Sequence, residues 1–391
     1  MTASSHPIHD VIVVGGGVVG AALTLALQRH GYDVVMVERG AAPRSWDASR
    51  YDLRVYALSP ASIALLDELG AWAPMRAARV SPYRRMRVWD DDPAQALVFD
   101  AADARAAQLG CIVENELMLS CLWQLLPSAS IRTASAVTAL QVSDAHADVT
   151  LADGAVLRAR LVIATDGADS PLRQMAGIEA QGWSYPQHAL VCHVQTEKPH
   201  DGACWQRFTP AGPLAFLPLA DGRSSIVWSS READTLAALD DAAFCARLEE
   251  ASQQQLGHIG GCTARMRFPL RLLHAERYVA PRLALAGDAA HVVHPLAGQG
   301  VNLGLADVRA LLQVLDEARG AARDIGGLRV LKRYERARRA DNLDMLALTD
   351  ALYRAFDLRL PAWNGMRALG LAAVNRLLPL RQLFMQRALG S

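Results

Sequence analysis

Residues 11–38 read VIVVGGGVVGAALTLALQRHGYDVVMVE. The β-branched run at 11–14 predicts a strand that is buried on both faces, and the helical spacing after it ends at Gly31. A second apolar run then ends at Glu38. Strand, glycine turn, helix and strand make one βαβ unit, which predicts an α/β fold with a doubly wound, Rossmann-like parallel sheet.

Gly15, Gly17 and Gly20 form the pattern G-x-G-x-x-G between that strand and that helix. The first glycine allows a tight turn, the second lets a pyrophosphate approach the backbone, and the third allows close packing of the helix on the sheet. The helix N-terminus offers free N–H donors. Glu38 is placed to bind a ribose 2′-hydroxyl, which favours FAD or NAD over NADP. A chance glycine turn is the weaker alternative.

Composition narrows the class of protein. Of 391 residues 51% are hydrophobic and 20% charged, which excludes a disordered or fibrous chain. Forty basic residues balance forty acidic ones, so binding of nucleic acid through bulk charge is not expected. No Cys-x-x-Cys pair, export signal or membrane-spanning run is present. We expect a cytoplasmic protein. His291 and His294 lack a third ligand, and no metal is expected.

A second stretch, LALAGDAAHVVHPLAGQGVNLGLAD at 283–307, predicts a strand, a glycine-rich loop and a helix beginning near Gly300. Asp288 at the strand end can bind a ribityl hydroxyl. The helix N-terminus can stabilise negative charge on a reduced flavin. A capped helix after a tight turn explains the same residues equally well.

The remaining pattern predicts the organisation of the chain. Residues 146–170 predict a hairpin around Asp153-Gly154, residues 183–230 a sheet of their own, and residues 234–256 a helix. We expect a discontinuous FAD-binding domain (1–75, 98–180 and 265–330), a substrate domain with an antiparallel sheet (76–97 and 181–264) and a helical C-terminal region (331–391).

Several segments together resemble a known family. The glycine pattern, ATDGADSPLR (164–173) and GDAAHVVHPLAGQGVN (287–302) resemble the motifs of the single-component flavin aromatic hydroxylases. DLRVYALSPAS (52–62) and LKRYERARRADN (331–342) narrow the resemblance to the FAD-dependent ring hydroxylases of ubiquinone biosynthesis. The similarity covers nearly the whole chain.

The resemblance implies a role for each matching residue. The ADP half of FAD would be held by Gly15, Gly17, Gly20, Glu38 and Arg39. Arg54 would reach the flavin or the pyrophosphate. Asn115, where many relatives carry Arg or Gln, would contact the ribityl chain or the phosphates. Asp166, with Arg173, would lie beside the pyrophosphate and, transiently, the nicotinamide. Asp288 would bind the ribityl chain. The isoalloxazine would be lined by Pro295, Gly298, Gln299, Gly300, Val301 and Asn302, with Pro295 and Gly298 near flavin C4a.

The resemblance also implies the reaction. NAD(P)H reduces FAD, O₂ adds to form a flavin C4a-hydroperoxide, and a polyprenyl phenol or benzoquinol is hydroxylated, at ring carbon 6 in preference to carbon 5. Two alternatives stay open: a flavin-bearing scaffold of a quinone-synthesis complex, associated with other ubiquinone-biosynthesis proteins, and a flavin oxidoreductase of another type.

Other features allow two interpretations each. The aromatic residues Trp205, Phe208, Phe216 and Trp228 line a substrate pocket or form plain core. ERARRAD at 335–341 predicts a solvated helix face. Residues 358–391 carry five arginines and no acid, which suits peripheral contact with the inner membrane surface or a helix docked on the protein.

Overall fold

The computed structural model describes residues 7–293 and 299–357. Its first unit contains a large sheet with a parallel centre and antiparallel pairs at β18–β19, β10–β11 and β9–β10. Strands follow the order β18-β19-β11-β1-β2-β8, with β10 and β9 added beside β11. β1 is parallel to β2 and β11, and β11 is parallel to β19. The expected doubly wound α/β fold is confirmed. The strands are β1 (Ile8–Val14), β2 (Val34–Val37), β8 (Ile131–Arg132), β9 (Val137–Val142), β10 (Ala147–Leu151), β11 (Val156–Ala164), β18 (Val279–Ala280) and β19 (Leu283–Leu285).

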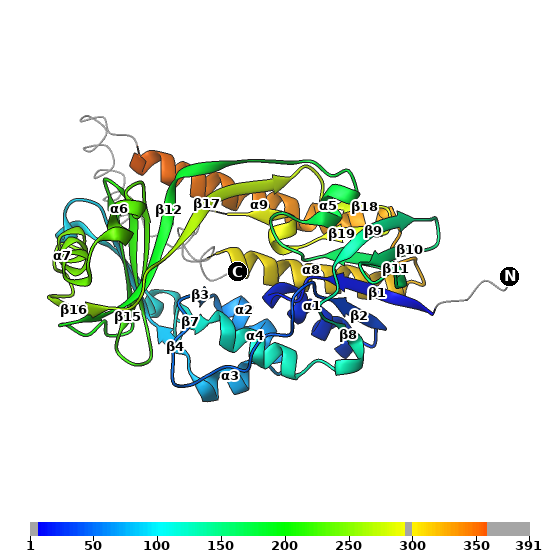
Figure 1. The fold of residues 1–391 in the computed structure, drawn as a ribbon, viewed down its shortest axis with the longest axis horizontal. Helices are drawn as coiled ribbons and strands as arrows, with labels where there is room; N and C mark the ends of the chain where they lie inside the picture. Colours follow the sequence, from blue (N-terminus) through cyan, green and yellow to red (C-terminus); the bar gives the residue numbers. More distant parts are fainter. Residues whose placement is uncertain (1–6, 294–298, 358–391) are drawn as a thin grey trace.

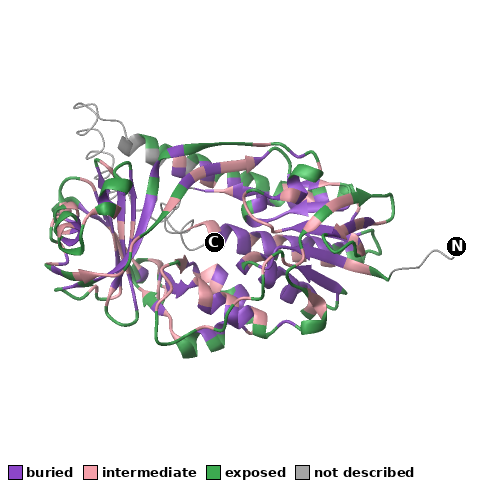
Figure 2. Cartoon of the chain, viewed as in Figure 1, coloured by how far each residue is buried: buried purple, intermediate pink, exposed green. Residues whose placement is uncertain are grey.

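Helices flank this sheet and complete its core. α1 packs against α8 and α4, and α9 packs against α8 (Figure 1). Residues 11–14 are buried, as their β-branched run predicts, and Figure 2 shows the same burial along the central strands. The helices of this unit are α1 (Val18–Arg29), α2 (Pro60–Glu68), α3 (Trp72–Ala78), α4 (Asn115–Gln124), α5 (Pro171–Met175), α8 (Gly300–Gly320) and α9 (Leu328–Asp357).

A nine-stranded sheet forms the second unit, at the left of Figure 1. Its order is β20-β17-β12-β15-β14-β13-β5-β6, with β16 beside β12, and all its pairs are antiparallel except β13 with β5. Its strands are β5 (Arg85–Trp89), β6 (Leu97–Asp100), β12 (Ala180–Thr196), β13 (Ala203–Thr209), β14 (Gly212–Pro218), β15 (Ser224–Ser230), β16 (Ile259–Cys262), β17 (Met266–Ala275) and β20 (His291–Val292). β6, β17 and β20 fall within or beside the ranges expected for the FAD-binding domain, yet hydrogen-bond into this sheet.

Two helices, α6 (Ala233–Ala238) and α7 (Asp241–Ala251), cover one face of the second sheet. The single helix expected over 234–256 is therefore wrong. The break has a local cause, because the Asp240 carboxylate accepts a hydrogen bond from the Ala243 N–H at 2.7 Å and so begins a new helix.

A small sheet of β3 (Val55–Leu58), β7 (Gly110–Glu114) and β4 (Ser81–Tyr83) completes the fold, with β7 in the middle. Short 3₁₀ turns include η4 (Gly287–Ala289), directly after β19. Within residues 7–293 and 299–357, no helix has the length and apolar character needed to cross a membrane. The C-terminal segment 358–391 lies outside the described residues.

Candidate functional site

The glycine pattern lies between β1 and α1 and leaves room for a ligand. Gly15 has a φ of +108°, and a Cβ there would lie 2.3 Å from the Thr165 carbonyl oxygen. A Cβ on Gly20 would lie 1.8 Å from the Gly15 carbonyl oxygen. At Gly17, by contrast, a Cβ would meet no atom within 4 Å. Gly17 is the N-cap of α1 and no side chain caps the helix, so its first N–H groups remain available to an anion.

Glu38 lies beside this turn at the end of β2. Its Oε2 accepts a hydrogen bond from the Gly16 N–H at 2.6 Å, and its Oε1 accepts one from the Gly40 N–H at 2.7 Å. Each carboxylate oxygen keeps a second lone pair for a ribose hydroxyl. Trp123 from α4 donates to the Gly16 carbonyl at 2.9 Å and closes the turn from outside. Arg39, the next residue, is exposed.

Asp166 follows β11 on the other side of the glycine turn. Its Oδ2 accepts a hydrogen bond from the Leu172 N–H at 3.2 Å, whereas its Oδ1 is buried without a partner among the described residues. Burial raises the pKa of this carboxyl. The Arg173 guanidinium donates hydrogen bonds to two backbone carbonyls, those of Ala289 at 2.8 Å and Ala168 at 2.7 Å. It therefore joins this motif to the turn that carries Asp288.

Asp288 lies on the turn after β19, and its side chain is exposed. Desolvation by the surrounding protein nevertheless raises the pKa of its carboxyl. We call the region that Asp288 shares with Arg54 and Tyr56 the cleft. Burial also raises the pKa of Tyr56. The positive charge of Arg54 opposes the rise at both Asp288 and Tyr56, so Arg54 lies near both side chains. The Tyr56 hydroxyl donates to Asn115 Oδ1 at 3.5 Å. The structure thus brings Arg54, Asn115 and Asp288 together from three segments far apart in sequence.

Tyr56 is a residue that sequence reasoning missed. The available signal was its place two residues after Arg54 at the start of β3, because alternate residues of a strand share one face.

The N-terminus of α8 begins beside this cleft. Gln299 is its N-cap and makes no side-chain cap, and a Cβ on Gly300 would meet no atom within 4 Å. Val301 is buried. Pro295 and Gly298, expected near flavin C4a, lie outside the described residues.

Asn302 uses its side chain inside the protein. Its Oδ1 accepts hydrogen bonds from the Ser59 N–H at 3.0 Å and from the Ser62 hydroxyl at 2.7 Å, and its Nδ2 donates to the Ala57 carbonyl at 2.9 Å. These bonds hold the start of α8 against the turn between β3 and α2, so this side chain shapes the wall of the cleft.

The four aromatic residues divide between the two faces of the second sheet. Phe216 and Trp228 are buried in the core beneath α7, and Trp205 packs at its edge. Phe208 lies on the opposite face, in a cluster with Val293 and Leu303 on either side of the glycine-rich loop. Of the four, only Phe208 packs toward the residues that flank that loop.

His291 pairs with a carboxylate in the protein. Its Nε2 lies 2.6 Å from Asp307 Oδ2, and both side chains are fully buried. Its candidate partner His294 lies outside the described residues. Across residues 7–293 and 299–357, no cluster of three His, Cys, Asp or Glu side chains has metal-site geometry.

These features fit FAD. The uncapped N-terminus of α1 with open space at Gly17 suits a pyrophosphate, and Glu38 suits a ribose. The unpartnered Asp166 Oδ1 and the Asp288 carboxylate can accept hydrogen bonds from hydroxyl or amide groups of a ligand. A βαβ unit with this cleft, covered by a second sheet, defines a flavin-dependent oxidoreductase.

Comparison with known proteins agrees. Residues 9–347 match the family model described as FAD binding domain. The chain is 42% identical over 387 residues to the 3-demethoxyubiquinol 3-hydroxylase of Escherichia coli, covering 97% of this chain and 98% of that protein. It is 39% identical to the ubiquinone hydroxylase UbiL of Rhodospirillum rubrum, covering 100% and 92%. The crystal structure of Klebsiella pneumoniae HpxO with FAD and uric acid has the same fold, with a TM-score of 0.77, 20% identity and coverage of 97% and 96%.

The chain belongs to the FAD-dependent ring hydroxylases of ubiquinone biosynthesis. It is a monooxygenase, and FAD is its cofactor.

Proposed function

We propose that the protein hydroxylates the ring of a polyprenylated methoxy-methyl benzoquinol that lacks one ring oxygen of ubiquinone, with O₂ as oxygen donor and NAD(P)H as reductant. The observation that carries this proposal is the 42% identity, over 97% of the chain, to a protein named 3-demethoxyubiquinol 3-hydroxylase. Hydroxylation of an earlier polyprenylphenol at the neighbouring ring carbon is the second candidate, supported by the match to relatives named ubiquinone biosynthesis monooxygenase COQ6.

Different residues of the site would bind different parts of FAD. Gly15, Gly17, Gly20, Glu38 and Arg39 would bind its ADP half. Asp166 would lie beside the pyrophosphate, with its unpartnered Oδ1 accepting a hydrogen bond from a hydroxyl or, transiently, from the nicotinamide amide. Arg54, Asn115 and Asp288 would bind the central part of the cofactor, and the segment from Pro295 to Asn302 would line its isoalloxazine.

Bound FAD supplies the activation of O₂, for which no protein side chain has the redox chemistry. The chain itself provides position and a dry surface. Phe208, Val293 and Leu303 pack together on the face of the second sheet that looks toward the cleft. An apolar wall there would exclude water from the reacting ring.

The polyprenyl chain of the substrate implies a peripheral contact with the membrane, since such quinols partition into the bilayer. We place this contact at the inner surface of the cytoplasmic membrane. The basic, acid-free segment 358–391, outside the described residues, is the candidate for it. Other proteins of ubiquinone biosynthesis are candidate partners.

The test is product formation by the purified protein. FAD-loaded protein is given NAD(P)H, ¹⁸O₂ and a short-prenyl demethoxyquinol, and the product is analysed by mass spectrometry and NMR. We expect one ¹⁸O atom in the product, at the ring carbon that lacked oxygen. Incorporation of oxygen from water would contradict a monooxygenase mechanism. FAD binding without any product, on either candidate substrate, would favour the scaffold interpretation.

A further inference from the structure

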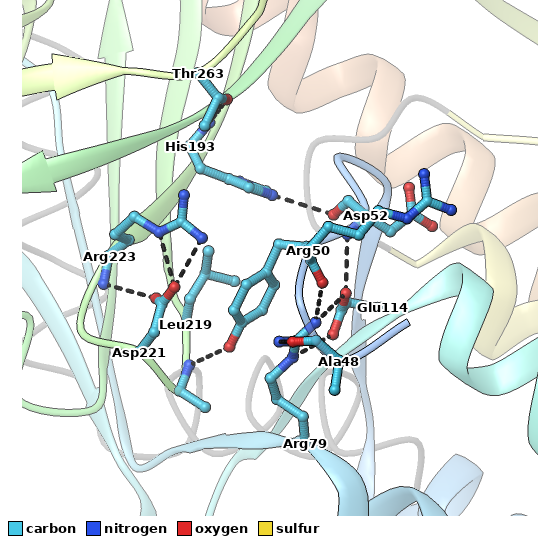
Figure 3. Close-up of polar contacts among 12 residues, drawn as sticks. Ala48, Arg50, Asp52, Arg79, Glu114, His193, Leu219, Asp221, Arg223 and Thr263 are labelled. Carbon is cyan, nitrogen blue, oxygen red and sulfur yellow. Dashed lines mark hydrogen bonds and ion pairs between the residues drawn. The ribbon is translucent and has the colours of Figure 1, made fainter. Parts of the chain in front are cut away.

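Residues 48–54, which we call the strap, cross between the two units of the molecule and carry Arg54. Figure 3 shows the polar contacts that hold them. On one side lie β7, the start of α4 and the end of α3. On the other side lies the second sheet, through β12 and the turn after β14. The strap is therefore held by contacts from both sides, and these contacts fix the position of Arg54.

Arg79 and Glu114 anchor the strap from the side of β7. The Arg79 guanidinium donates to Glu114 Oε2 at 2.8 Å and to the Ala48 carbonyl at 2.9 Å, and lies 3.7 Å from the centre of the Tyr51 ring. Glu114 Oε1 accepts a hydrogen bond from the Asp52 N–H at 2.8 Å. Because Glu114 is buried and Arg79 is only 16% exposed, water competes little for this charged pair, which fixes the strap.

His193 holds the strap from the second sheet. This side chain of β12 is 1% exposed, and its Nε2 lies 3.1 Å from the Asp52 carbonyl oxygen (Figure 3). A carbonyl only accepts, so Nε2 carries the proton and donates it. The Tyr51 ring meets the imidazole edge-on, with centroids 5.9 Å apart.

The other imidazole nitrogen shows that the ring is neutral. His193 Nδ1 is buried and has no partner among the described residues. A proton there would be buried without an acceptor, and burial lowers the pKa of this histidine. His193 is therefore a fixed single donor, aimed at one carbonyl of the strap.

The same peptide region sets the position of Arg54. Asp52 Oδ1 accepts a hydrogen bond from the Arg54 N–H at 3.0 Å, and the Arg54 carbonyl accepts one from the Asn115 N–H at 3.0 Å. The guanidinium lies 5.5 Å from the centre of the Phe268 ring on β17. A rotation of the Asp52 peptide would thus move Arg54 relative to the cleft that contains Asp288.

We propose that His193 is a positioning residue of the flavin site, which holds Arg54 toward the cofactor by donating from the substrate sheet to the Asp52 carbonyl. The inference rests on the proposed function, because it takes Arg54 to contact bound FAD. It adds a link that no motif of the sequence indicates: the sheet that covers the substrate also fixes the segment that binds the cofactor.

Two isosteric amides test the donor. In His193→Gln the amide nitrogen reaches the place of Nε2, whereas in His193→Asn it reaches only the place of Nδ1. We expect His193→Gln to keep the wild-type FAD dissociation constant and visible flavin spectrum. His193→Asn should raise the dissociation constant about fivefold, the loss expected for one hydrogen bond, and shift the spectrum. Equal behaviour of the two variants would overturn the proposal.

A double-mutant cycle tests the route through Arg54. In an Arg54→Met background, the change His193→Asn should weaken FAD binding by less than about twofold, because the group that it positions is gone. An undiminished effect would mean that His193 acts on the cofactor by another path, and would overturn the proposal. Ser225→Ala is the matched control. Ser225 lies directly opposite His193 on β15, and its hydroxyl has no partner among the described residues, so FAD binding should not change.

The wild-type protein supplies a measurement that needs no stable variant. In ¹⁵N-histidine NMR spectra, His193 should appear as the neutral Nε2–H tautomer, and its signal should move when FAD is removed. A signal that does not respond to FAD would overturn the proposal. If wild-type protein binds no FAD at all, the proposed function fails first, and the two failures are thereby distinguished.

Discussion

Gly17 and Gly20 belong to one sequence pattern but differ in what a side chain would meet. A side chain at Gly17 enters open space, so Gly17→Val should leave the apoprotein folded while filling the place of the pyrophosphate. Losing two hydrogen bonds to a charged group, at about 1.5–3 kcal/mol each, predicts FAD binding weakened at least ~100-fold. Flavin absorbance after gel filtration and the melting temperature of the apoprotein measure the two effects.

Gly20→Ala is the matched comparison. Its Cβ would lie 1.8 Å from the Gly15 carbonyl oxygen, so this change should lower the melting temperature of the apoprotein as well as FAD binding. Full flavin occupancy in Gly17→Val would contradict the assignment of the glycine turn to the cofactor.

His274 gives a pH dependence of stability. Burial, aided by the positive charge of Arg339, lowers its pKa from the usual 6.5 to about 4, and the Tyr278 hydroxyl lies 3.1 Å from its Nε2. Below pH 6.5 the unfolded chain takes up a proton that the folded chain refuses until about pH 4. Stability should therefore fall over this range as the pH falls, by roughly 2–3 kcal/mol.

The non-titrating variant His274→Gln tests this origin. Urea unfolding measured between pH 7 and pH 4 should show a shallower loss of stability in His274→Gln than in wild type. Parallel curves for the two proteins would assign the loss to other groups.

At the scale of elements, a buried polar network joins α8, α9 and the turn that carries Asp288. Asp307 on α8 accepts hydrogen bonds from the Gly287 N–H at 2.9 Å and from Arg338 Nε at 2.8 Å, and its Oδ2 also lies 2.6 Å from His291. Arg338 on α9 donates in turn to Asn342 at 2.9 Å. Through Gly287, the network fixes the backbone directly before Asp288.

Breaking this network should be costly. Asp307→Asn removes the buried counterion of Arg338 and leaves only the exposed Asp341, 3.1 Å away, which predicts a loss of about 3 kcal/mol in the free energy of unfolding. The exposed pair of Arg309 on α8 and Glu68 on α2, 3.2 Å apart, is the control. Arg309→Met should cost less than about 1 kcal/mol. Urea titrations of both variants measure these losses. Similar losses in the free energy of unfolding would refute a structural role for the buried pair.

The same network marks a limit of sequence analysis. The stretch 335–341 was expected to be a solvated helix face, which holds for Arg336 and Arg339 and is wrong for Arg338, 8% exposed. The charge pattern along a helix shows which residues share a face. It does not show that an acid 31 residues away lies beneath one of them. By contrast, β1, α1 and β2 were predictable because every interaction that forms them is local.

At the scale of the whole molecule, the second sheet also shows that sequence patterns do not reveal contacts between distant segments. Its existence followed from the strand-rich composition of 183–230, but the faces of its strands did not. Trp228 and Phe208 are both buried on strands of this sheet, and only the packing of α7 against one face places Trp228 in a different core from Phe208. Likewise, no sequence motif indicated that His193 meets the strap, because that contact joins residues 141 apart.

The separate cores of the two units predict how the molecule responds to loss of FAD. One hydrophobic cluster surrounds the first sheet, while another lies between the second sheet and α7. The proposed FAD ligands lie in the first unit and the strap. FAD at 100 times its dissociation constant should stabilise the fold by about 2.7 kcal/mol, and its removal should lower the melting temperature accordingly.

Hydrogen exchange then shows where this stabilisation acts. Without FAD, amides of α1 and the strap should exchange faster, since the ligand no longer occupies the α1 N-terminus or draws Arg54 inward. Amides of β14 and β15 should change little, because their core beneath α7 touches no proposed ligand. A slower rate in FAD-bound protein at β12 around His193, lost in His193→Asn, would show the strap carrying the effect of the cofactor into the substrate sheet. Uniform acceleration across both sheets would instead mean that the units unfold as one.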